Sequence, residues 1–245
     1  MKTNDLVGCA AVLCLCLAAA ANAANCSTAG NVLVDPSFEL QTPATNGGWI
    51  PFGAVFSTAY ARTGQWSQFV SAFNGVSGSF EQFPAAPGSQ WRLTGNGLAP
   101  SPLLGVPSYG LVQVTFFDIF GNDLGTVETA GQQFPAKISN PVDGTTPGWN
   151  YLDTGTATAP EGAAYIQAFT LYIDFSGIPN GQGVYFDDLN LTILGVNHGG
   201  YVSSIAHNAG ALKQAGLLTG AQQAAMIKAA ANSNGGKQND CAAAQ

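Results

Sequence analysis

The sequence predicts an antiparallel β-sandwich followed by a short helical hairpin. From about residue 30 to residue 195, runs rich in Val, Phe, Tyr and Thr alternate with turns of Gly, Pro and Asn. No long helical pattern separates these runs, so a parallel α/β sheet is excluded. After residue 197 the apolar residues recur at helical spacing instead.

The chain begins with a segment typical of an export signal. Lys2 precedes an apolar run from Leu6 to Ala21, and Ala21-Asn22-Ala23 fits the small-residue cleavage pattern. We expect residues 1–23 to be a signal peptide that is removed. The mature protein would then be secreted or periplasmic, with no membrane span after cleavage.

Cleavage would leave two cysteines, Cys26 and Cys241, near opposite ends of the mature chain. An even pair of cysteines in an exported protein is a disulfide candidate. A bridge closing so long a loop would stabilise the folded chain by about 4–5 kcal/mol on the chain-entropy model. Free or intermolecularly paired thiols are the alternative.

The strand candidates follow one another at short intervals, and turn residues bound each of them. In the first half of the β-region they are 31–34, 49–52, 57–61, 66–72, 79–83 and 91–95. In the second half they are 111–117, 124–127, 149–156, 164–175 and 184–194. The Pro- and Gly-rich stretches 96–108 and 132–148 are expected to be loops.

Residues 201–232 are predicted to form the helical hairpin. Val202, Ile205 and Leu212 recur at helical spacing, and Thr219 with Gln222 matches the capping box of a second helix. This hairpin could dock on the sandwich or on a protein partner.

The charge distribution supports a boundary between the β-region and the helical hairpin near residue 197, and the net charge argues against a nucleic-acid partner. Charged residues make up only 9% of the chain and the formal net charge is −7, which argues against nucleic-acid binding. Acids dominate before residue 196, whereas lysines dominate after it. The expected divisions are the signal peptide 1–23, a β-sandwich domain 24–196, a helical hairpin 197–234 and a flexible end 235–245.

Four segments occur in an order that points to a family. They are Asn31-Val32-Leu33-Val34-Asp35-Pro36-Ser37-Phe38-Glu39, Gly48-Trp49, Ala159-Pro160-Glu161-Gly162-Ala163 and Val184-Tyr185-Phe186-Asp187-Asp188-Leu189. Together they resemble the opening, the last turn and the last strand of galactose-binding-domain-like carbohydrate-binding modules, as found in exported bacterial proteins. The resemblance covers about residues 30–195 and implies that the sandwich is a β-jelly roll.

The resemblance also implies a structural calcium ion (Ca2+) where the first and last strands meet. Its ligands would be Glu39, Asp187 and Asp188, among the roughly six to eight oxygens that calcium takes. Because consecutive strand residues face opposite sides, we expect only one of the two aspartates to point at the site. The alternative is that Glu39 is exposed and the aspartate pair caps a strand end.

Sugar-binding sites combine aromatic rings with neighbouring polar side chains. Tyr60 and Trp66 flank the polar turn 61–65, and Tyr109 follows the Pro-rich loop, so these three are the ligand-binding candidates. Trp49 and Trp91 are expected in the core. We therefore expect an exported, non-catalytic domain that binds a polysaccharide or another glycan. A structural or surface-interaction protein without a glycan ligand is the alternative.

Few residues favour catalysis. The two histidines, His198 and His207, lie outside the β-region, so the sandwich alone holds no Ser-His-Asp triad. Pairs of carboxylates for a glycan-active hydrolase or lyase could be assembled from Glu81, Asp118, Glu128 or Glu161. Solvated surface charges explain such acids equally well, so catalysis is the second alternative.

Overall fold

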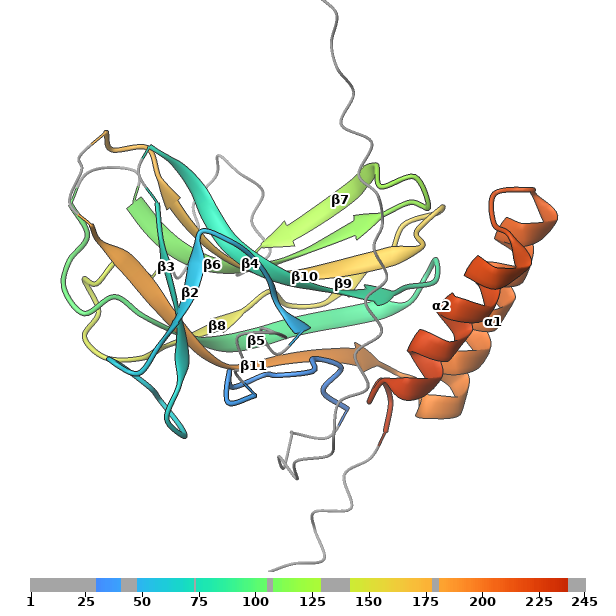
Figure 1. Cartoon of the computed structure of the whole chain (residues 1–245), viewed down its shortest axis with the longest axis horizontal. Coiled ribbons are helices and arrows are strands. Elements are labelled where there is room, and N and C mark those ends of the chain that lie inside the picture. Colours follow the sequence, from blue (N-terminus) through green and yellow to red (C-terminus); the bar gives the residue numbers. More distant parts are fainter. Residues whose placement is uncertain are drawn as a thin grey trace, which may run out of the picture.

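Two antiparallel sheets lie one above the other, and a pair of helices covers one end of them (Figure 1). The structure is a computed structural model, and it describes residues 30–40, 48–72, 74–104, 108–128, 142–177 and 181–237. The predicted fold, a mainly β antiparallel sandwich with a C-terminal helical hairpin, is confirmed.

The upper layer in Figure 1 is a five-stranded sheet with the order β1-β4-β10-β6-β7. Its strands are β1 (Ile50–Phe52), β4 (Gly75–Pro84), β6 (Ser108–Phe117), β7 (Asp123–Glu128) and β10 (Tyr165–Asp174). Every neighbouring pair is antiparallel. The long central strand β10 pairs along its whole length with β4 on one side and with β6 on the other.

The lower layer is a six-stranded sheet with the order β2-β3-β11-β5-β8, and β9 pairs with β5. Its strands are β2 (Ala54–Ser57), β3 (Ser67–Ser71), β5 (Gln90–Leu98), β8 (Asn150–Asp153), β9 (Ala157–Thr158) and β11 (Gly183–Leu194). β11 is the longest strand and lies in the middle of the sheet.

The inward side chains of the two sheets form one apolar core, as strand alternation requires. Trp49 and Trp91 are fully buried in it, which agrees with the prediction for both. The side chains at alternate positions point away from the core, so each sheet also has an outer face.

The N-terminal segment lies beside the second half of β11, so the first and last β-type segments do meet. Asn31 forms a bridge with Thr192, and its side-chain Nδ2 donates to the carbonyl of Leu189 at 2.9 Å. The amide of Leu191 donates to Asn31 Oδ1 at 3.0 Å. The predicted strand 31–34 is nevertheless wrong as a regular strand, because the Asn31 side chain replaces part of the backbone ladder.

Other predicted boundaries are also wrong. The strand expected at 149–156 ends at Asp153. The strand expected at 57–61 lies at 54–57, and residues 58–60 form a bend instead. The loop expected from residue 96 begins later, because Asn96 and Gly97 pair with both β8 and β11. Most of the other predicted loop, 132–148, lies outside the described residues.

The helices are α1 (His198–Gln214) and α2 (Gly220–Asn232), and the predicted capping box of Thr219 and Gln222 is present. α1 docks on the end of the sandwich. Tyr201 donates its hydroxyl to the carbonyl of Pro84 at 2.9 Å, and its ring meets the Trp91 ring edge-on. Asn208 donates to two carbonyls of the turns beneath it. A protein partner for the hairpin stays a prediction.

The first and last described residues are neighbours. A Cβ added to Gly30 would lie 3.6 Å from the carbonyl oxygen of Lys237. The predicted signal peptide, Cys26, Cys241 and residues 238–245 lie outside the described residues, so the disulfide and the flexible end stay predictions. No helix within the described ranges is both long and apolar enough to cross a membrane.

Replacing Tyr201 with Phe should destabilise the protein by about 1–3 kcal/mol, because the buried carbonyl of Pro84 would lose its donor. Thermal or urea unfolding followed by circular dichroism measures the effect. Tyr151→Phe is the matched control, since Tyr151 is 59% exposed. Equal stability of the two variants would show that the Tyr201 hydrogen bond does not help to hold α1 on the sandwich.

Candidate functional site

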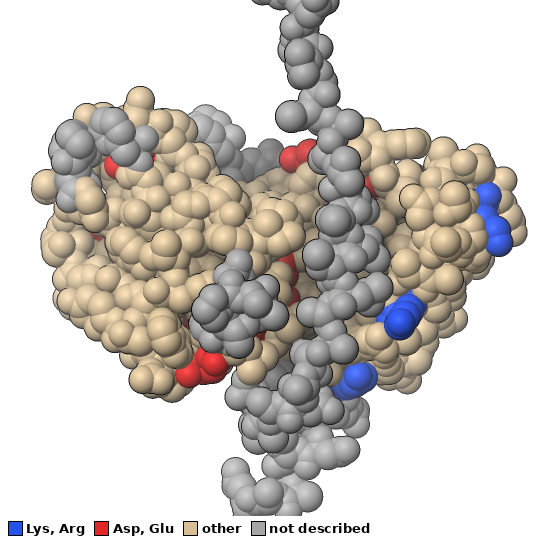
Figure 2. Space-filling model, viewed as in Figure 1, with Lys and Arg blue, Asp and Glu red and all other residues tan. Residues whose placement is uncertain are grey.

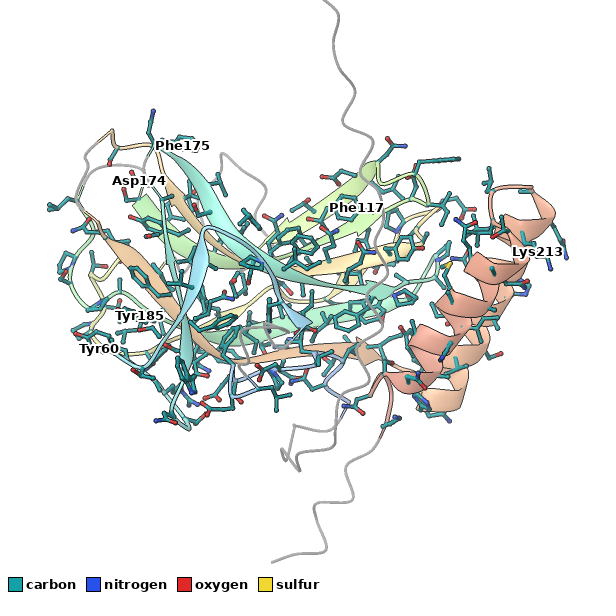
Figure 3. The ribbon with its side chains drawn as sticks, viewed as in Figure 1. Tyr60, Phe117, Asp174, Phe175, Tyr185 and Lys213 are labelled. Carbon is teal, nitrogen blue, oxygen red and sulfur yellow. The ribbon has the colours of Figure 1, made fainter. Side chains whose placement is uncertain are left out.

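We call the outer face of the five-stranded sheet the upper face. Its side chains change from polar at one end to apolar at the other. Strand register places its residues in rows that cross β4, β10 and β6. One row contains Gln82, Gln167 and Thr115, and the next contains Phe80, Phe169 and Gln113. Beyond them the rows become fully apolar. Phe117 lies toward one end of this layer and Phe175 toward the other (Figure 3).

Three phenylalanine rings meet on the upper face. The ring centroids of Phe80 and Phe169 are 5.4 Å apart, and each lies 6.4 Å from the centroid of Phe52. Gly78 makes room for them, because a Cβ there would lie 3.1 Å from the Phe52 ring and 2.1 Å from the carbonyl oxygen of Thr170. Phe52 is 40% exposed, and the other two rings are partly exposed.

Amide side chains adjoin these rings. Gln167 Nε2 donates to Gln82 Oε1 at 2.8 Å across the strand pair. Gln113 Nε2 donates to the hydroxyl of Thr115 at 2.9 Å, and that hydroxyl lies 3.0 Å from the hydroxyl of Thr126. The three glutamines are half-buried, so the sheet holds their amides in place while each is still partly exposed to solvent.

The opposite end of the upper face is apolar. Leu111, Leu171 and Ile173 form a small cluster separate from the main core, and Tyr109 and Phe169 pack against it. The candidate Tyr109 therefore belongs to this face. Its neighbours here come from strands far apart in the sequence, which no local pattern could reveal.

The three predicted calcium ligands all contact one loop, residues 62–66. Asp187 Oδ2 accepts hydrogen bonds from the amides of Arg62 and Thr63, at 2.7 and 3.2 Å. Asp188 accepts from the guanidinium of Arg62 at 2.6 Å and from the hydroxyl of Thr63. Glu39 Oε1 accepts from the amides of residues 65 and 66 in the same loop, at 2.8 and 2.7 Å.

The expectation that only one aspartate can point at this region is wrong. The register of β11 against β5 shifts between Asp187 and Asn190, and Asp188 has a φ of 49°. This β-bulge breaks the alternation, so both carboxylates turn toward the same loop. The alternative, a solvent-exposed Glu39, is also wrong, because Glu39 is half-buried and accepts two backbone hydrogen bonds.

Burial raises the pKa of Asp187 to about 7, although three backbone amides, those of Arg62, Thr63 and Asp188, oppose the shift. Arg62 pairs with Asp188 rather than with Asp187. Within the part of the chain that the structure describes, no group of three or more His, Cys, Asp or Glu side chains is placed to hold a metal ion. Any calcium here would also need carbonyl oxygens.

The two favoured aromatic candidates lie in different surroundings. Tyr60 is 45% exposed, and its ring centroid lies 4.9 Å from that of Tyr185. Trp66 is half-buried and packs against the main core. Sequence reasoning missed Tyr185, because an apolar strand gives no local sign of which of its aromatic side chains face outward.

Three of the side chains considered for catalysis, Glu81, Asp118 and His198, contact backbone groups of the fold. Glu81 points into the sandwich and accepts from the amides of Val34 and Asp35. Asp118 accepts from backbone amides of its own hairpin turn. His198 begins α1, and its Nδ1 lies 2.7 Å from the carbonyl oxygen of Gly235.

No family model matches the sequence, and no curated protein matches it. Solved structures match at low identity. The CBM22-1 xylan-binding domain of Paenibacillus barcinonensis Xyn10C is 14% identical with a TM-score of 0.48, over 69% of this chain and 99% of that one. TmCBM61 in complex with β-1,4-galactotriose is 13% identical with a TM-score of 0.38, over 66% and 98%.

Larger proteins match over a part of their length. The α-L-arabinofuranosidase MgGH51 is 17% identical with a TM-score of 0.47, and the tailspike protein 4 of bacteriophage CBA120 is 12% identical with a TM-score of 0.45. This chain spans 27% of the first and 22% of the second. Every one of these TM-scores is below 0.5, so none of them decides what this chain binds.

Burial of Glu81 predicts a pH dependence of stability. Burial raises its pKa from 4.5 to about 8, so between these values the folded chain keeps a proton that the unfolded chain has lost. The free energy of unfolding should therefore fall as the pH rises through this range and level off above it. Glu81→Gln should show a smaller fall, measured as Tm by circular dichroism across the range. Parallel Tm curves for the variant and the wild type would contradict the assignment.

Proposed function

We propose that this protein is an exported, non-catalytic domain that binds a polysaccharide on the upper face. The observation that supports the proposal most strongly is the meeting of phenylalanine rings and glutamine amides in adjacent rows of the five-stranded sheet. Apolar rings stack on the C–H faces of pyranoses, while amides donate to and accept from the hydroxyl groups.

A sheet is a suitable support for such a site. The rows are fixed by backbone pairing along β4, β10 and β6, so the rings and amides keep their spacing without a ligand. A pre-organised site binds with a smaller loss of conformational entropy. An extended sugar chain can then contact several rows at once.

The charge distribution favours a neutral ligand. On the face shown in Figure 2 the basic side chains lie over the helical end, and most of the sandwich surface carries neither colour. Lys213 and Lys228 lie on α1 and α2, outside the rows of the upper face. The upper-face rows across β4, β10 and β6 contain no Lys, Arg, Asp or Glu, so they suit a neutral glycan, which needs no compensating charge.

Phe169→Ala and Phe80→Ala should each weaken polysaccharide binding by about tenfold, the loss of one stacking contact. Affinity electrophoresis against xylan, galactan, mannan and β-glucan, followed by calorimetry on any that binds, measures this. Phe120→Ala is the matched control, because Phe120 is 70% exposed in a turn outside the sheet face. The proposal would be refuted if the Phe169 and Phe80 variants bound with the wild-type affinity, or if the wild-type protein bound none of the four polysaccharides. The second result would favour a structural or surface-interaction protein.

We also propose a structural calcium ion bound by Glu39, Asp187 and Asp188 together with backbone carbonyls. As the structure describes them, these carboxylates form no metal-binding group, so the ion would require them to turn away from the amides of loop 62–66. The contact of all three carboxylates with the one loop supports this proposal. A cation would also stabilise the ionised form of the buried Asp187, whose pKa burial raises. The ion would supply only structural stabilisation, by joining the N-terminal segment, β11 and the loop 62–66.

A chelator should lower the Tm of the wild-type protein, because removing an ion that binds only the folded state removes its contribution to stability. Differential scanning calorimetry with and without EDTA, and with calcium restored, measures the change. Asp187→Asn should have a lower Tm that no longer responds to the chelator. A wild-type Tm that EDTA does not alter would rule out the ion.

A further inference from the structure

A second aromatic cluster lies on the outer face of the six-stranded sheet, and we call it the tyrosine corner. It consists of Tyr60, Tyr185 and Phe69. Tyr185 in β11 pairs with Phe69 in β3, and Phe69 pairs with Val55 in β2, so these side chains share the side that faces away from the core. The centroids of Phe69 and Tyr185 are 4.7 Å apart. Figure 3 shows Tyr60 beside Tyr185, in the lower layer.

We propose that the tyrosine corner is a second sugar-binding site, which takes one pyranose ring of a neutral polysaccharide. It lies on the opposite side of the sandwich from the upper face and is independent of it. The proposal goes beyond the first site because it makes the protein bivalent.

The ring geometry favours a sugar. Tyr60 and Tyr185 meet at 61°, so one ring can lie against a pyranose face while the other stands beside it. Tyr60 is 45% exposed and Val55 is 57% exposed, which leaves an open apolar floor. The Tyr185 hydroxyl interacts with the side chain of Ser57.

A charged side chain follows Tyr60 in the same loop. It belongs to Arg62, two residues after Tyr60, and is 43% exposed. One of its nitrogens donates to Asp188, and the guanidinium has further N–H groups for a sugar hydroxyl. Because Asp188 offsets the charge of Arg62, this loop favours a neutral sugar over an acidic one.

The loop that carries Tyr60 is held at several points. The hydroxyl of Ser67 donates to the carbonyl of Tyr60, while Asp187 and Glu39 accept from the amides of the loop. Asp187 lies two residues after Tyr185 in β11, so one strand both supplies a ring of the site and fixes the loop opposite it. Such support pre-organises a binding site.

The size of the corner also favours a sugar over a protein. Three rings and one valine are far smaller than the roughly 800 Å² that each partner buries in a standard protein interface. One pyranose ring, in contrast, is covered by one or two aromatic side chains.

Calorimetry tests the corner separately from the upper face. The probes are β-1,4-linked hexasaccharides of glucose, xylose, mannose and galactose. Wild-type protein should bind two molecules of at least one of them per chain. Tyr60→Ala and Tyr185→Ala should each remove one of the two, Phe169→Ala should remove the other, and the Tyr60→Ala/Phe169→Ala double variant should bind none.

Tyr151→Ala is the matched control, because Tyr151 is an exposed tyrosine on β8 of the same sheet. Tyr60 is on an exposed loop, so its variant should keep the wild-type Tm even if Tyr185→Ala unfolds. Wild-type stoichiometry in Tyr60→Ala, or a single site in the wild type that only Phe169→Ala removes, would overturn the proposal. A single site that only Tyr60→Ala removes would support the corner and refute the upper face. No binding of any hexasaccharide would overturn both.

Discussion

The β-bulge at Asp187 and Asp188 is the constraint on which much of the sandwich depends. It lies in β11, the central strand of the lower sheet, and turns two consecutive carboxylates toward the loop 62–66. Pairing with β3 ends just before it, at Phe186, which leaves the rest of that edge free for the N-terminal segment. The amide of Leu189 then donates to the carbonyl of Pro36. A regular strand at this position would leave both the loop and the segment without these partners.

Local sequence patterns predicted the fold well, but they could not predict contacts between residues that are distant in the sequence. Turn residues and β-type runs located most strands, and the capping box at Thr219 located the start of α2. The bulge could not be predicted, because nothing in the sequence around Asp187 and Asp188 marks a break in the strand alternation. The break depends on partners in loop 62–66, which is distant in the sequence. The strand expected at 57–61 failed for a related reason. Residues after Ser57 bend away to meet carboxylates that lie far along the chain.

The candidate site shows the same limit. Tyr60 was identified because it flanks a polar turn, which is a local signal. Its neighbour Tyr185 was missed, since only the register of β3 with β11 shows that it faces outward. Phe80, Phe169 and Gln167 were missed for the same reason, because they come from two strands about 85 residues apart that pair in the sheet. Aromatic residues in a strand are usually core, and nothing local in the sequence indicates that Phe80 and Phe169 lie on the outer face.

The closeness of Gly30 and Lys237 has a mechanical consequence. A force that pulls the two ends of the described chain apart acts first on the contacts next to those ends. These are the hydrogen bonds of Asn31 to β11 and the docking of α1 through Tyr201. The ladder between β4, β10 and β6 lies away from this line of force. Tension on the ends would therefore peel off the N-terminal segment and the helices before it reached the sheet that carries the upper face.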